Sequence, residues 1–380
     1  MTEKHIPFNK PFMTGQEIDC ITDAHNRGQL SGNGYYTKQC HRLLQEITTS
    51  KSVLLTHSCT AALEMAAILS EVGPGDEVIM PAFTFVSTAN AFVLRGALPV
   101  FVDVRSDTLN LDENHIEQAI TDRTRVIVVV HYAGVACEMD RIMALAKKHN
   151  LIVIEDSAQG ILAEYKGRPL GSIGHLAAFS FHETKNVTCG EGGALLINDD
   201  KFSQRAEIIW EKGTNRGLFS RGAVDRYTWL DIGSSFLPGE LNAAFLFAQL
   251  ECAKQITQTR IKIWNLYHTA LERLEEKQLL IRPSIPSNIK HNAHLYYILL
   301  PNKQIRDDLI QFLANKDIHT VFHYLPLDLS DAGKQHCRTS GSIAITHRVS
   351  DCLLRLPLWI GVEKHQNYIV DHITSYLLHR

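Results

Sequence analysis

The sequence predicts an α/β protein: a mixed, mostly parallel sheet with helices on both faces, followed by a smaller α+β domain. Between about residues 50 and 200, short apolar runs alternate with segments of helical periodicity. The run RVIVVVH at 125–131 is almost continuously apolar, as expected for a strand buried on both faces. The length of 380 residues favours two domains, because single cores rarely grow to that size.

The first half of the chain supplies the predicted sheet. Alternation of strands with helices implies parallel crossovers, which place helices on both faces. The predicted strands are Ser52–Thr56, Glu77–Met80, Pro99–Val104, Arg125–His131, Leu151–Ile154, Leu176–Phe181 and Ala194–Ile197. The predicted helices are Ala61–Ser70, which ends before Gly73-Pro74-Gly75, and Met139–Lys148, which Asn150 closes.

The second half predicts a separate α+β unit. A long helical segment from Glu240 to about Leu274 bridges to it. The expected elements are strands Leu295–Leu300 and Thr320–Tyr324, the amphipathic helix Ile305–Ala314 and the final helix Ile369–Leu378. We therefore expect a large domain at residues 1–250 and a small domain at 251–380, with residues 1–30 packing on the small one.

Composition excludes several classes of protein. The net charge of −3 argues against nucleic acid or an anionic membrane surface as a partner. No apolar run reaches the ~18 residues of a membrane span, and MTEKHIPFNKPF lacks a signal-peptide core, so we expect a cytoplasmic protein. The eight cysteines form no C-x-x-C pair and the 19 histidines no H-E-x-x-H, so we expect no metal.

Polar residues cluster where the predicted strands end. In parallel sheets, ligands bind at the loops beyond the carboxyl ends of the strands. The clusters are His57-Ser58-Cys59-Thr60, Phe83-Thr84-Phe85, Asp156-Ser157-Ala158-Gln159 and His182-Glu183-Thr184-Lys185. Their convergence is the first sign of a site.

Three features, in this order, predict the chemistry. Ser58–Leu63 is predicted to be a turn that leads into a helix. The start of this helix either binds a phosphate group or is an ordinary helix cap. Asp156 ends a buried strand and needs a cation such as a protonated pyridine, unless it is a cap or half of a structural ion pair. Lys185 follows a strand and precedes Gly190-Glu-Gly-Gly193, which makes it a candidate for Schiff-base chemistry rather than a surface charge.

The chain resembles the DegT/DnrJ/EryC1/StrS family of sugar aminotransferases along essentially its whole length. The resemblance rests on GDEVIMPAFTFVSTANAFVLRGALPVFVDV, VHYAGVACEMDRIMALAKKHNL, EDSAQG, FSFHETKN and GEGGALL. It implies a pyridoxal-phosphate (PLP) enzyme with the aspartate-aminotransferase fold (fold type I), working as a homodimer. The segments HETKN, EKGTNR and FHYLPL narrow the resemblance within the family. They imply a dTDP-linked 4-keto-6-deoxy sugar as amino acceptor and L-glutamate as amino donor.

The resemblance also implies residue roles. Lys185 would hold PLP as a Schiff base, Asp156 would pair with the pyridine nitrogen, and Gln159 would contact the ring hydroxyl. Phe85 would stack on the ring. The phosphate would be held by the turn containing Ser58, by the Thr60 and Ala61 amides and by the Ser180 hydroxyl. Arg216, His323 and Tyr324 are the candidate substrate residues.

Two positions depart from the family pattern. The family's G-x-N-x-R stretch, which reaches the partner's cofactor phosphate, is here Gly233-Ser-Ser235-Phe-Leu237. The family's Y-x-P-x-H is here Tyr324-Leu-Pro326-Leu-Asp328, so that Asp replaces a His expected to line the sugar site.

Other activities stay open to different degrees. The related sugar dehydratases carry His in place of the lysine, so Lys185 favours transamination. The motifs do not separate the galacto product from its 4-epimer or from a 3-amino sugar. A nicotinamide oxidoreductase needs G-x-G-x-x-G after a strand, and a P-loop enzyme needs G-x-x-x-x-G-K-[ST]; neither motif is present. A non-catalytic binding protein would show no visible absorbance from a bound cofactor.

Overall fold

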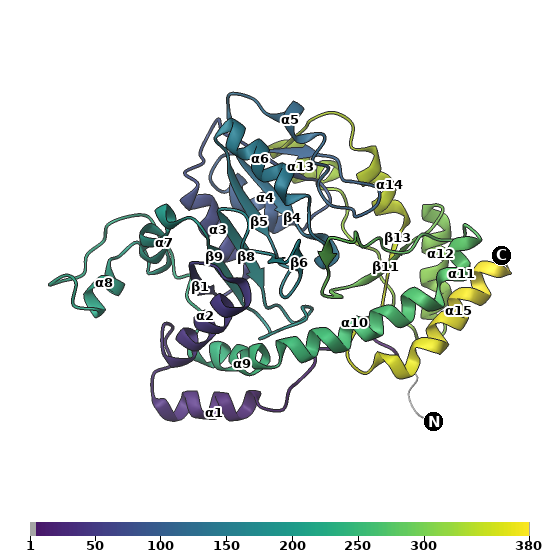
Figure 1. Cartoon of the computed structure of the whole chain (residues 1–380), viewed down its shortest axis with the longest axis horizontal. Helices are drawn as coiled ribbons and strands as arrows, with labels where there is room; N and C mark the ends of the chain where they lie inside the picture. The colour runs from purple at the N-terminus through teal and green to yellow at the C-terminus, as the bar shows by residue number, and fades with distance from the viewer. Residues whose placement is uncertain (1–4, 380) are drawn as a thin grey trace.

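The computed structural model describes residues 5–379. Within them, one central sheet of eight strands has the order β1-β9-β8-β5-β4-β2-β3-β12 (Figure 1). Its strands are β1 Ser52–Thr56, β2 Glu77–Pro81, β3 Leu98–Val102, β4 Thr124–Val130, β5 Ile152–Asp156, β8 Leu176–Ser180, β9 Gly193–Ile197 and β12 Arg338–Thr339. A three-stranded sheet joins β6 Glu164–Tyr165, β7 Arg168–Pro169 and β10 Ile289–Lys290.

The sheet is mostly parallel, as the sequence predicts. Every neighbouring pair from β8 across to β12 is parallel, whereas β9 runs antiparallel to both β1 and β8. The seven strands predicted for the first half of the chain all form, with ends that shift by one or two residues.

Helices cover both faces because each strand alternates its side chains between them. In β4, Val126 and Val128 pack in one core with helices α3 (Cys59–Leu69) and α4 (Val86–Val93), while Ile127 and Val129 pack on the opposite face with α6 (Met139–His149). The helices of this part are α1 Glu17–Arg27, α2 Tyr35–Thr48, α3 Cys59–Leu69, α4 Val86–Val93, α5 Ile116–Ala119, α6 Met139–His149, α7 Ser203–Trp210, α8 Arg216–Ser220 and α9 Glu240–Glu251.

The C-terminal part has its own apolar core around an antiparallel pair, β11 Tyr296–Leu299 and β13 Leu353–Leu356. The long helix α10 leads into it from α9 (Figure 1). Its helices are α10 Ala253–Ala270, α11 Glu272–Glu276, α12 Lys303–Ala314, α13 Asp331–His336, α14 Ala344–Cys352 and α15 Gln366–Leu378.

The predicted strand Thr320–Tyr324 is wrong. This segment is extended, but its only ladder contact among the described residues is a bridge from Val321 to Arg355. Residues 321–324 of this segment line the cavity described below.

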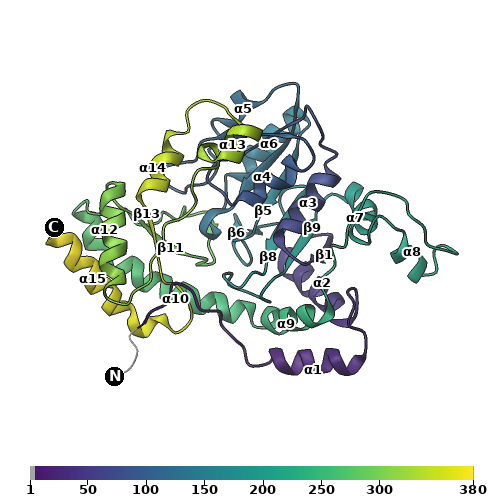
Figure 2. The ribbon, with the colours of Figure 1, turned by 180° about the vertical axis from the view of Figure 1, so that it is seen from behind.

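The N-terminal segment contacts both parts of the chain. Helix α1 lies along α9, which both views show (Figures 1 and 2). Upstream of it, Ile6 is buried in the C-terminal core and bridges to Ile318, and the Trp359 indole N–H donates to the Pro7 carbonyl at 2.9 Å. Residues 1–4 of the segment lie outside the described residues, and the domain boundary at 250 stays a prediction. Within residues 5–379, no helix is long and apolar enough to cross a membrane.

Glu155, the residue before Asp156, anchors the loop that precedes β8 from the opposite face of β5. Its buried carboxylate accepts hydrogen bonds from His131 Nε2 at 2.9 Å and from the amides of Gly171, Ile173 and Gly174 at 2.8, 2.7 and 2.6 Å. Burial alone would raise the pKa of Glu155, but the hydrogen bonds from His131, Gly174 and Gly171 bring the pKa below its ordinary value. The ionised carboxylate therefore stabilises the fold above the unfolded-state pKa, and this contribution is lost as the pH falls through the folded-state pKa.

Replacing Glu155 by glutamine should lower the free energy of unfolding by about 3–5 kcal/mol, because three amides would then compete for one neutral carbonyl oxygen in a buried site. Denaturant unfolding followed by circular dichroism measures this. Asp200→Asn, which breaks the exposed pair with Lys51, is the matched control and should change stability little. A loss at Glu155 no larger than at Asp200 would contradict the anchoring role.

Candidate active site

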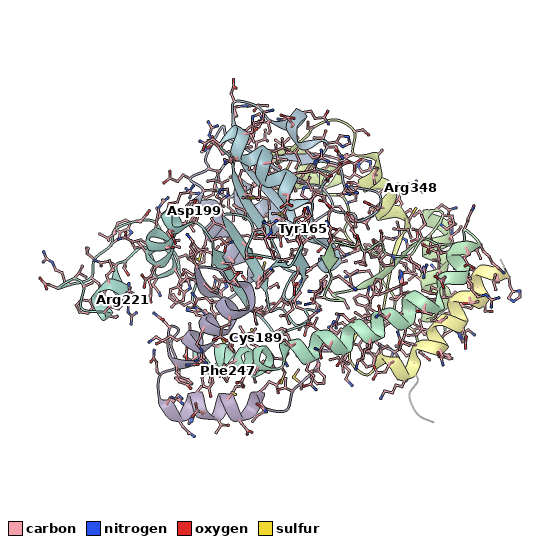
Figure 3. The ribbon with its side chains drawn as sticks, in the orientation of Figure 1. Tyr165, Cys189, Asp199, Arg221, Phe247 and Arg348 are labelled. Carbon is pink, nitrogen blue, oxygen red and sulfur yellow. The ribbon has the colours of Figure 1, made fainter. Side chains whose placement is uncertain are left out.

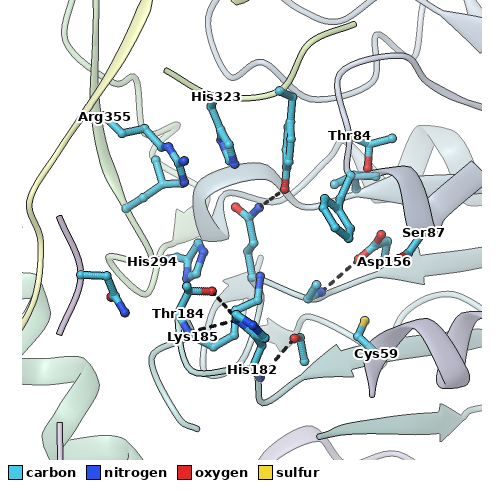
Figure 4. Close-up of a pocket in the computed structure, with 18 of the residues that line it drawn as sticks. Cys59, Thr84, Ser87, Asp156, His182, Thr184, Lys185, His294, His323 and Arg355 are labelled. Carbon is cyan, nitrogen blue, oxygen red and sulfur yellow. Dashed lines mark hydrogen bonds between the residues drawn. The ribbon is translucent and has the colours of Figure 1, made fainter. Parts of the chain in front are cut away.

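A cavity of about 850 Å³ lies where β4, β5 and β8 end and the C-terminal part begins. Side chains from both parts of the chain line it, and Figure 4 shows many of them pointing into the same space. Of the predicted site residues, those that line it are Ser58, Thr60, Phe85, Asp156, Gln159, Ser180, Lys185, His323 and Tyr324.

Lys185 lies in the loop that follows β8. Its N–H donates to the His182 carbonyl at 2.9 Å, and this turn directs the lysine side chain into the cavity (Figure 4). Burial lowers the pKa of Lys185, and the charge of Arg355 lowers this pKa further, against the opposing influence of Cys59 and Asp156. A larger share of the amine is therefore neutral near pH 7, which is the form that attacks an aldehyde.

Asp156 ends β5 and is buried beside the same cavity. One of its carboxylate oxygens accepts from the Thr88 hydroxyl at 2.7 Å, and the other accepts from the Ala158 N–H at 3.2 Å. Burial raises the pKa of Asp156, and the two hydrogen bonds and the charge of Lys185 oppose the rise. Within residues 5–379, no basic side chain forms an ion pair with it, which leaves room for a cationic ligand atom such as a protonated pyridine nitrogen.

The turn before α3 lines one end of the cavity. Ser58 caps the helix by accepting from the Ala61 N–H at 3.1 Å, and the Thr60 hydroxyl contacts the Ser87 hydroxyl at 2.7 Å. Gly193 packs directly on this turn: a Cβ there would come within 2.4 Å of the Ser58 carbonyl carbon. The last glycine of Gly-Glu-Gly-Gly is thus needed for β9 to lie against the turn.

Ala61 was expected to contact the cofactor phosphate through its backbone amide, but its position in the structure differs. It does not line the cavity, and its amide is engaged by the Ser58 hydroxyl. Ser58 and Ser180 do line the cavity, and the first N–H groups of a helix have no partner within the helix. A phosphate at this end would therefore meet Thr60 and the two serines directly, and the role of the Ala61 amide stays a prediction.

Aromatic and amide groups form the side walls. The Gln159 amide bridges the two parts of the chain: its oxygen accepts from the Ala133 N–H at 2.7 Å and its nitrogen donates to the Tyr324 hydroxyl at 3.1 Å. His323 stacks on Tyr324 with ring centroids 3.7 Å apart. Phe85 is 57% exposed and faces the cavity mouth, so a flat ring can stack on it.

Three positions that the sequence analysis discussed as possible site residues do not line the cavity. Arg216 begins α8, which projects from the body at the left of Figure 1. Ser235 is exposed and bridges to Glu211. Asp328, at the family's His position, pairs with His347 at 2.8 Å. Their predicted roles stay predictions.

The sequence did not lead us to several lining residues. Arg260, His294 and Arg355 reach the cavity from the C-terminal part, and Phe8 and Asn9 reach it from the N-terminal segment. Phe8 and Asn9 lie in PFNKP, and Arg355 lies in RLPLW, the runs at which the family resemblance begins and ends. No role at the site was predicted for them, because only the fold brings them together.

The residues present fit the cofactor that the resemblance implies. A lysine with a lowered pKa, a buried carboxylate without a basic partner, an exposed ring and a helix start with serine hydroxyls surround one cavity. Lys185 would bind the cofactor aldehyde, Asp156 the ring nitrogen, and Ser58, Thr60 and Ser180 the phosphate. Within residues 5–379, no group of three or more His, Cys, Asp or Glu side chains is arranged to hold a metal ion.

Ser180→Ala should weaken PLP retention more than Ser235→Ala does. Ser180 is buried at the end of β8 and lines the cavity, whereas Ser235 is exposed and does not. Removing a hydrogen bond to a charged phosphate costs about 1.5–3 kcal/mol, or roughly ten- to hundredfold in affinity. Absorbance-monitored PLP dissociation, with sedimentation to follow assembly, measures both variants. A larger loss from Ser235→Ala would instead place the phosphate contact at the family's inter-subunit position.

The chain is similar to known aminotransferases over most of its length. Residues 11–374 match the DegT/DnrJ/EryC1/StrS aminotransferase family. The chain is 34% identical over 334 residues to the spore coat polysaccharide biosynthesis protein SpsC of Bacillus subtilis, covering 85% of this chain and 84% of SpsC.

Solved structures are similar over nearly their whole length. The PLP form of Spr1654 from Streptococcus pneumoniae, assigned as a sugar aminotransferase, superposes with a TM-score of 0.90 at 27% identity and covers 98% of each chain. DesV of S. venezuelae superposes with a TM-score of 0.89 at 26% identity, again covering 98% of each chain.

Proposed function

The chain belongs to the DegT/DnrJ/EryC1/StrS aminotransferase family and is a PLP-dependent sugar aminotransferase of fold type I, and from this premise we propose its substrates. The acceptor is dTDP-4-keto-6-deoxy-D-glucose and the donor is L-glutamate. The product is dTDP-4-amino-4,6-dideoxy-D-galactose, as for the transaminase of enterobacterial common antigen synthesis that the chain resembles.

One observation carries this choice of substrate. Two of the three phrases that narrow the resemblance, HETKN and FHYLPL, supply walls of the cavity. The first contributes His182, Thr184 and Lys185, and the second contributes Phe322, His323 and Tyr324. Residues of both phrases therefore line the space in which an acceptor sugar would react.

The residues divide the work as follows. PLP, when bound, supplies the electron sink for moving an amino group. Lys185 would hold the cofactor aldehyde, and its amine would carry the proton to and from the donor Cα once the donor is bound. Asp156 would keep the ring nitrogen of the cofactor protonated. Over the whole reaction, L-glutamate becomes 2-oxoglutarate and the sugar ketone becomes an amine.

A product assay tests the acceptor. Purified chain with PLP, L-glutamate and dTDP-4-keto-6-deoxy-D-glucose should give an amino sugar whose proton couplings at C4 report an axial amine, the galacto configuration. Lys185→Ala is the control that should give none. An equatorial C4 amine, or amination at C3, would replace the proposed product by one of the alternatives.

The proposal includes a cytoplasmic homodimer. Its interface would rest on broad apolar burial rather than on one polar contact near Ser235. The exposed apolar side chains of the segment around α8, among them Phe219, Tyr227 and Trp229, are consistent with such a surface. Sedimentation of the holoenzyme at micromolar concentration should give a dimer, and a monomer would contradict this part of the proposal.

A further inference from the structure

Tyr132 lies outside the cavity and contacts one of the residues that line it. Its side chain is buried in the turn η1 (Tyr132–Gly134), which follows β4. Its N–H donates to the Asn110 side chain at 2.8 Å, which fixes the start of the turn. Its hydroxyl lies 2.7 Å from Nδ1 of His323, a residue that does line the cavity. The turn at the end of a central strand thus contacts the His323 ring from behind.

The Tyr132 hydroxyl donates this hydrogen bond. Among residues 5–379, the hydroxyl has no other hydrogen-bond partner, so its proton is satisfied only if Nδ1 of His323 accepts it. A buried O–H without an acceptor would carry the full cost of its lost hydration. A neutral imidazole whose Nδ1 accepts has its own proton on Nε2. The hydrogen bond therefore favours the Nε2–H tautomer of His323.

The His323 ring is neutral as well as oriented. Burial lowers the pKa of His323 well below its ordinary value, and the charges of Arg355 and Lys185 lower this pKa further. Near pH 7, the ring therefore has one N–H and no charge. Within residues 5–379, Nε2 forms no hydrogen bond, and Figure 4 shows the ring extending into the space above Lys185. An N–H donor without a partner thus faces the cavity.

The neighbouring rings hold the direction of this donor. His323 stacks on Tyr324 with 25° between the ring planes, and the Tyr324 hydroxyl accepts from the Gln159 amide at 3.1 Å. Phe83 packs edge-on against both rings, with centroids 6.3 Å from His323 and 5.5 Å from Tyr324. Because the imidazole is packed on its face and bonded at Nδ1, it has little freedom to turn when a ligand binds.

The charge and the position of the donor select its partner. A carboxylate or a diphosphate is matched better by a cation, whereas an uncharged N–H suits a neutral oxygen such as a hydroxyl. Lys185 is close enough for its charge to affect His323, so the partner oxygen lies near the carbon that reacts. In the proposed acceptor, the carbonyl carbon C4 has one neighbour with a hydroxyl, C3. Its other neighbour, C5, bears the methyl group and the ring oxygen.

We infer that Tyr132 is a positioning residue, which fixes His323 so that the Nε2–H donates to the C3 hydroxyl of the acceptor sugar. The inference rests on the proposed function, because it takes a 4-keto sugar with a C3 hydroxyl as the acceptor. It deepens that function by naming the pair of residues that recognises the sugar beside the reacting carbon. His323 contacts the substrate, and Tyr132 acts only through His323.

NMR tests the positioning without any substrate. The holoenzyme is labelled with ¹⁵N-histidine, and the signals of His323 are identified by their absence in His323→Gln. In the parent, the proton should be on Nε2, and Nδ1 should have the chemical shift of an unprotonated nitrogen. In Tyr132→Phe, the two nitrogen shifts should move toward each other, because the second tautomer is no longer disfavoured.

Steady-state kinetics test the contact with the sugar. With L-glutamate saturating, the KM for the acceptor should rise about 10- to 100-fold in His323→Leu and about 2- to 10-fold in Tyr132→Phe. His323→Gln keeps an N–H near the Nε2 position and should recover most of the loss. The half-saturating L-glutamate concentration in the donor half-reaction should stay as in the parent. The double variant Tyr132→Phe/His323→Leu should be no worse than His323→Leu alone.

Deoxy analogues of the acceptor identify the hydroxyl. The parent should use the full sugar better than its 3-deoxy analogue, and His323→Leu should use the two equally well. The 2-deoxy analogue, whose missing hydroxyl lies one carbon farther from C4, is the matched control. The parent and His323→Leu should discriminate against it to the same extent.

Tyr165→Phe controls for the loss of a buried tyrosine hydrogen bond. Tyr165, labelled in Figure 3, is as buried as Tyr132 and does not line the cavity, and its hydroxyl donates to Glu138 at 3.0 Å. Its variant should leave the acceptor KM unchanged. Circular dichroism establishes that the variants are folded, and His323→Gln and the analogues decide the matter if Tyr132→Phe is not.

Three results would overturn the inference: a proton on Nδ1 of His323 in the parent, an unchanged acceptor KM in His323→Leu, or additive losses in the double variant. Failure of the proposed function is distinguishable from these. If the parent aminates no dTDP sugar, the proposed acceptor fails, and the hydroxyl contact fails with it. If the parent aminates the sugar but uses the 3-deoxy analogue equally well, only the inference fails.

Discussion

Replacing Lys185 by alanine should abolish turnover and remove the visible absorbance of covalently held PLP while the chain stays folded. Lys185 is the lysine that lines the cavity, and burial already lowers the pKa of its amine. Without it, no described lysine lines the cavity to bind the cofactor aldehyde as a Schiff base. Removal of the reacting group should reduce kcat by at least about 10³-fold, which corresponds to roughly 4 kcal/mol of barrier.

The control for this experiment is Lys147→Ala, at the exposed end of α6. It should keep both the absorbance and the turnover of the parent. Lys185→Arg should keep a positive charge in the cavity yet bind no aldehyde, so it should resemble Lys185→Ala. Normal turnover in either Lys185 variant would contradict the assignment of Lys185 as the residue that binds PLP.

Replacing Asp156 by asparagine should leave PLP bound but lower kcat by orders of magnitude. The amide keeps the shape of the carboxylate, and Lys185 and the phosphate end still hold the cofactor. What is lost is the anion that keeps the ring nitrogen protonated; such a pair shifts a pKa by about 1–3 units, or about 1.4–4 kcal/mol. Spectral titration of PLP and steady-state rates separate retention from turnover.

Thr88→Val is the graded control for Asp156. It removes the hydroxyl that donates to the carboxylate at 2.7 Å but leaves the charge. It should reduce turnover far less than Asp156→Asn does. If Asp156→Asn turned over like the parent, Asp156 would be reassigned as a structural cap held by Thr88 and Ala158.

The sequence allowed the cofactor end of the site to be predicted because these residues follow strands. A parallel sheet gathers strand ends at one edge, so Asp156 and Ser180, although distant in sequence, were expected to meet. The structure places them, with Lys185, at one cavity. Such reasoning works for any residue whose position is fixed by the end of a buried strand.

The C-terminal wall of the cavity could not be predicted in the same way. Arg355 lies within β13, and nothing in the local sequence shows that this strand lies near the ends of β5 and β8. Thr320–Tyr324 has the alternation of a strand, yet it forms an extended wall with one bridge to Arg355. Helices α1 and α2 were not assigned from the sequence, although their apolar residues recur with helical spacing, and both pack against α9.

Glu155 and Asp156 are neighbours in the chain, but substitutions at the two positions should be harmful for different reasons. Successive side chains on a strand point to opposite faces, so Glu155 holds the loop at 171–174 while Asp156 meets the cavity. In a mutational scan of living cells, variants at 155 should be depleted through low protein abundance. Variants at 156 should accumulate to normal levels as inactive protein. Measuring protein abundance alongside growth would therefore distinguish the two positions. Sequence variation by itself would show both positions as equally intolerant of substitution.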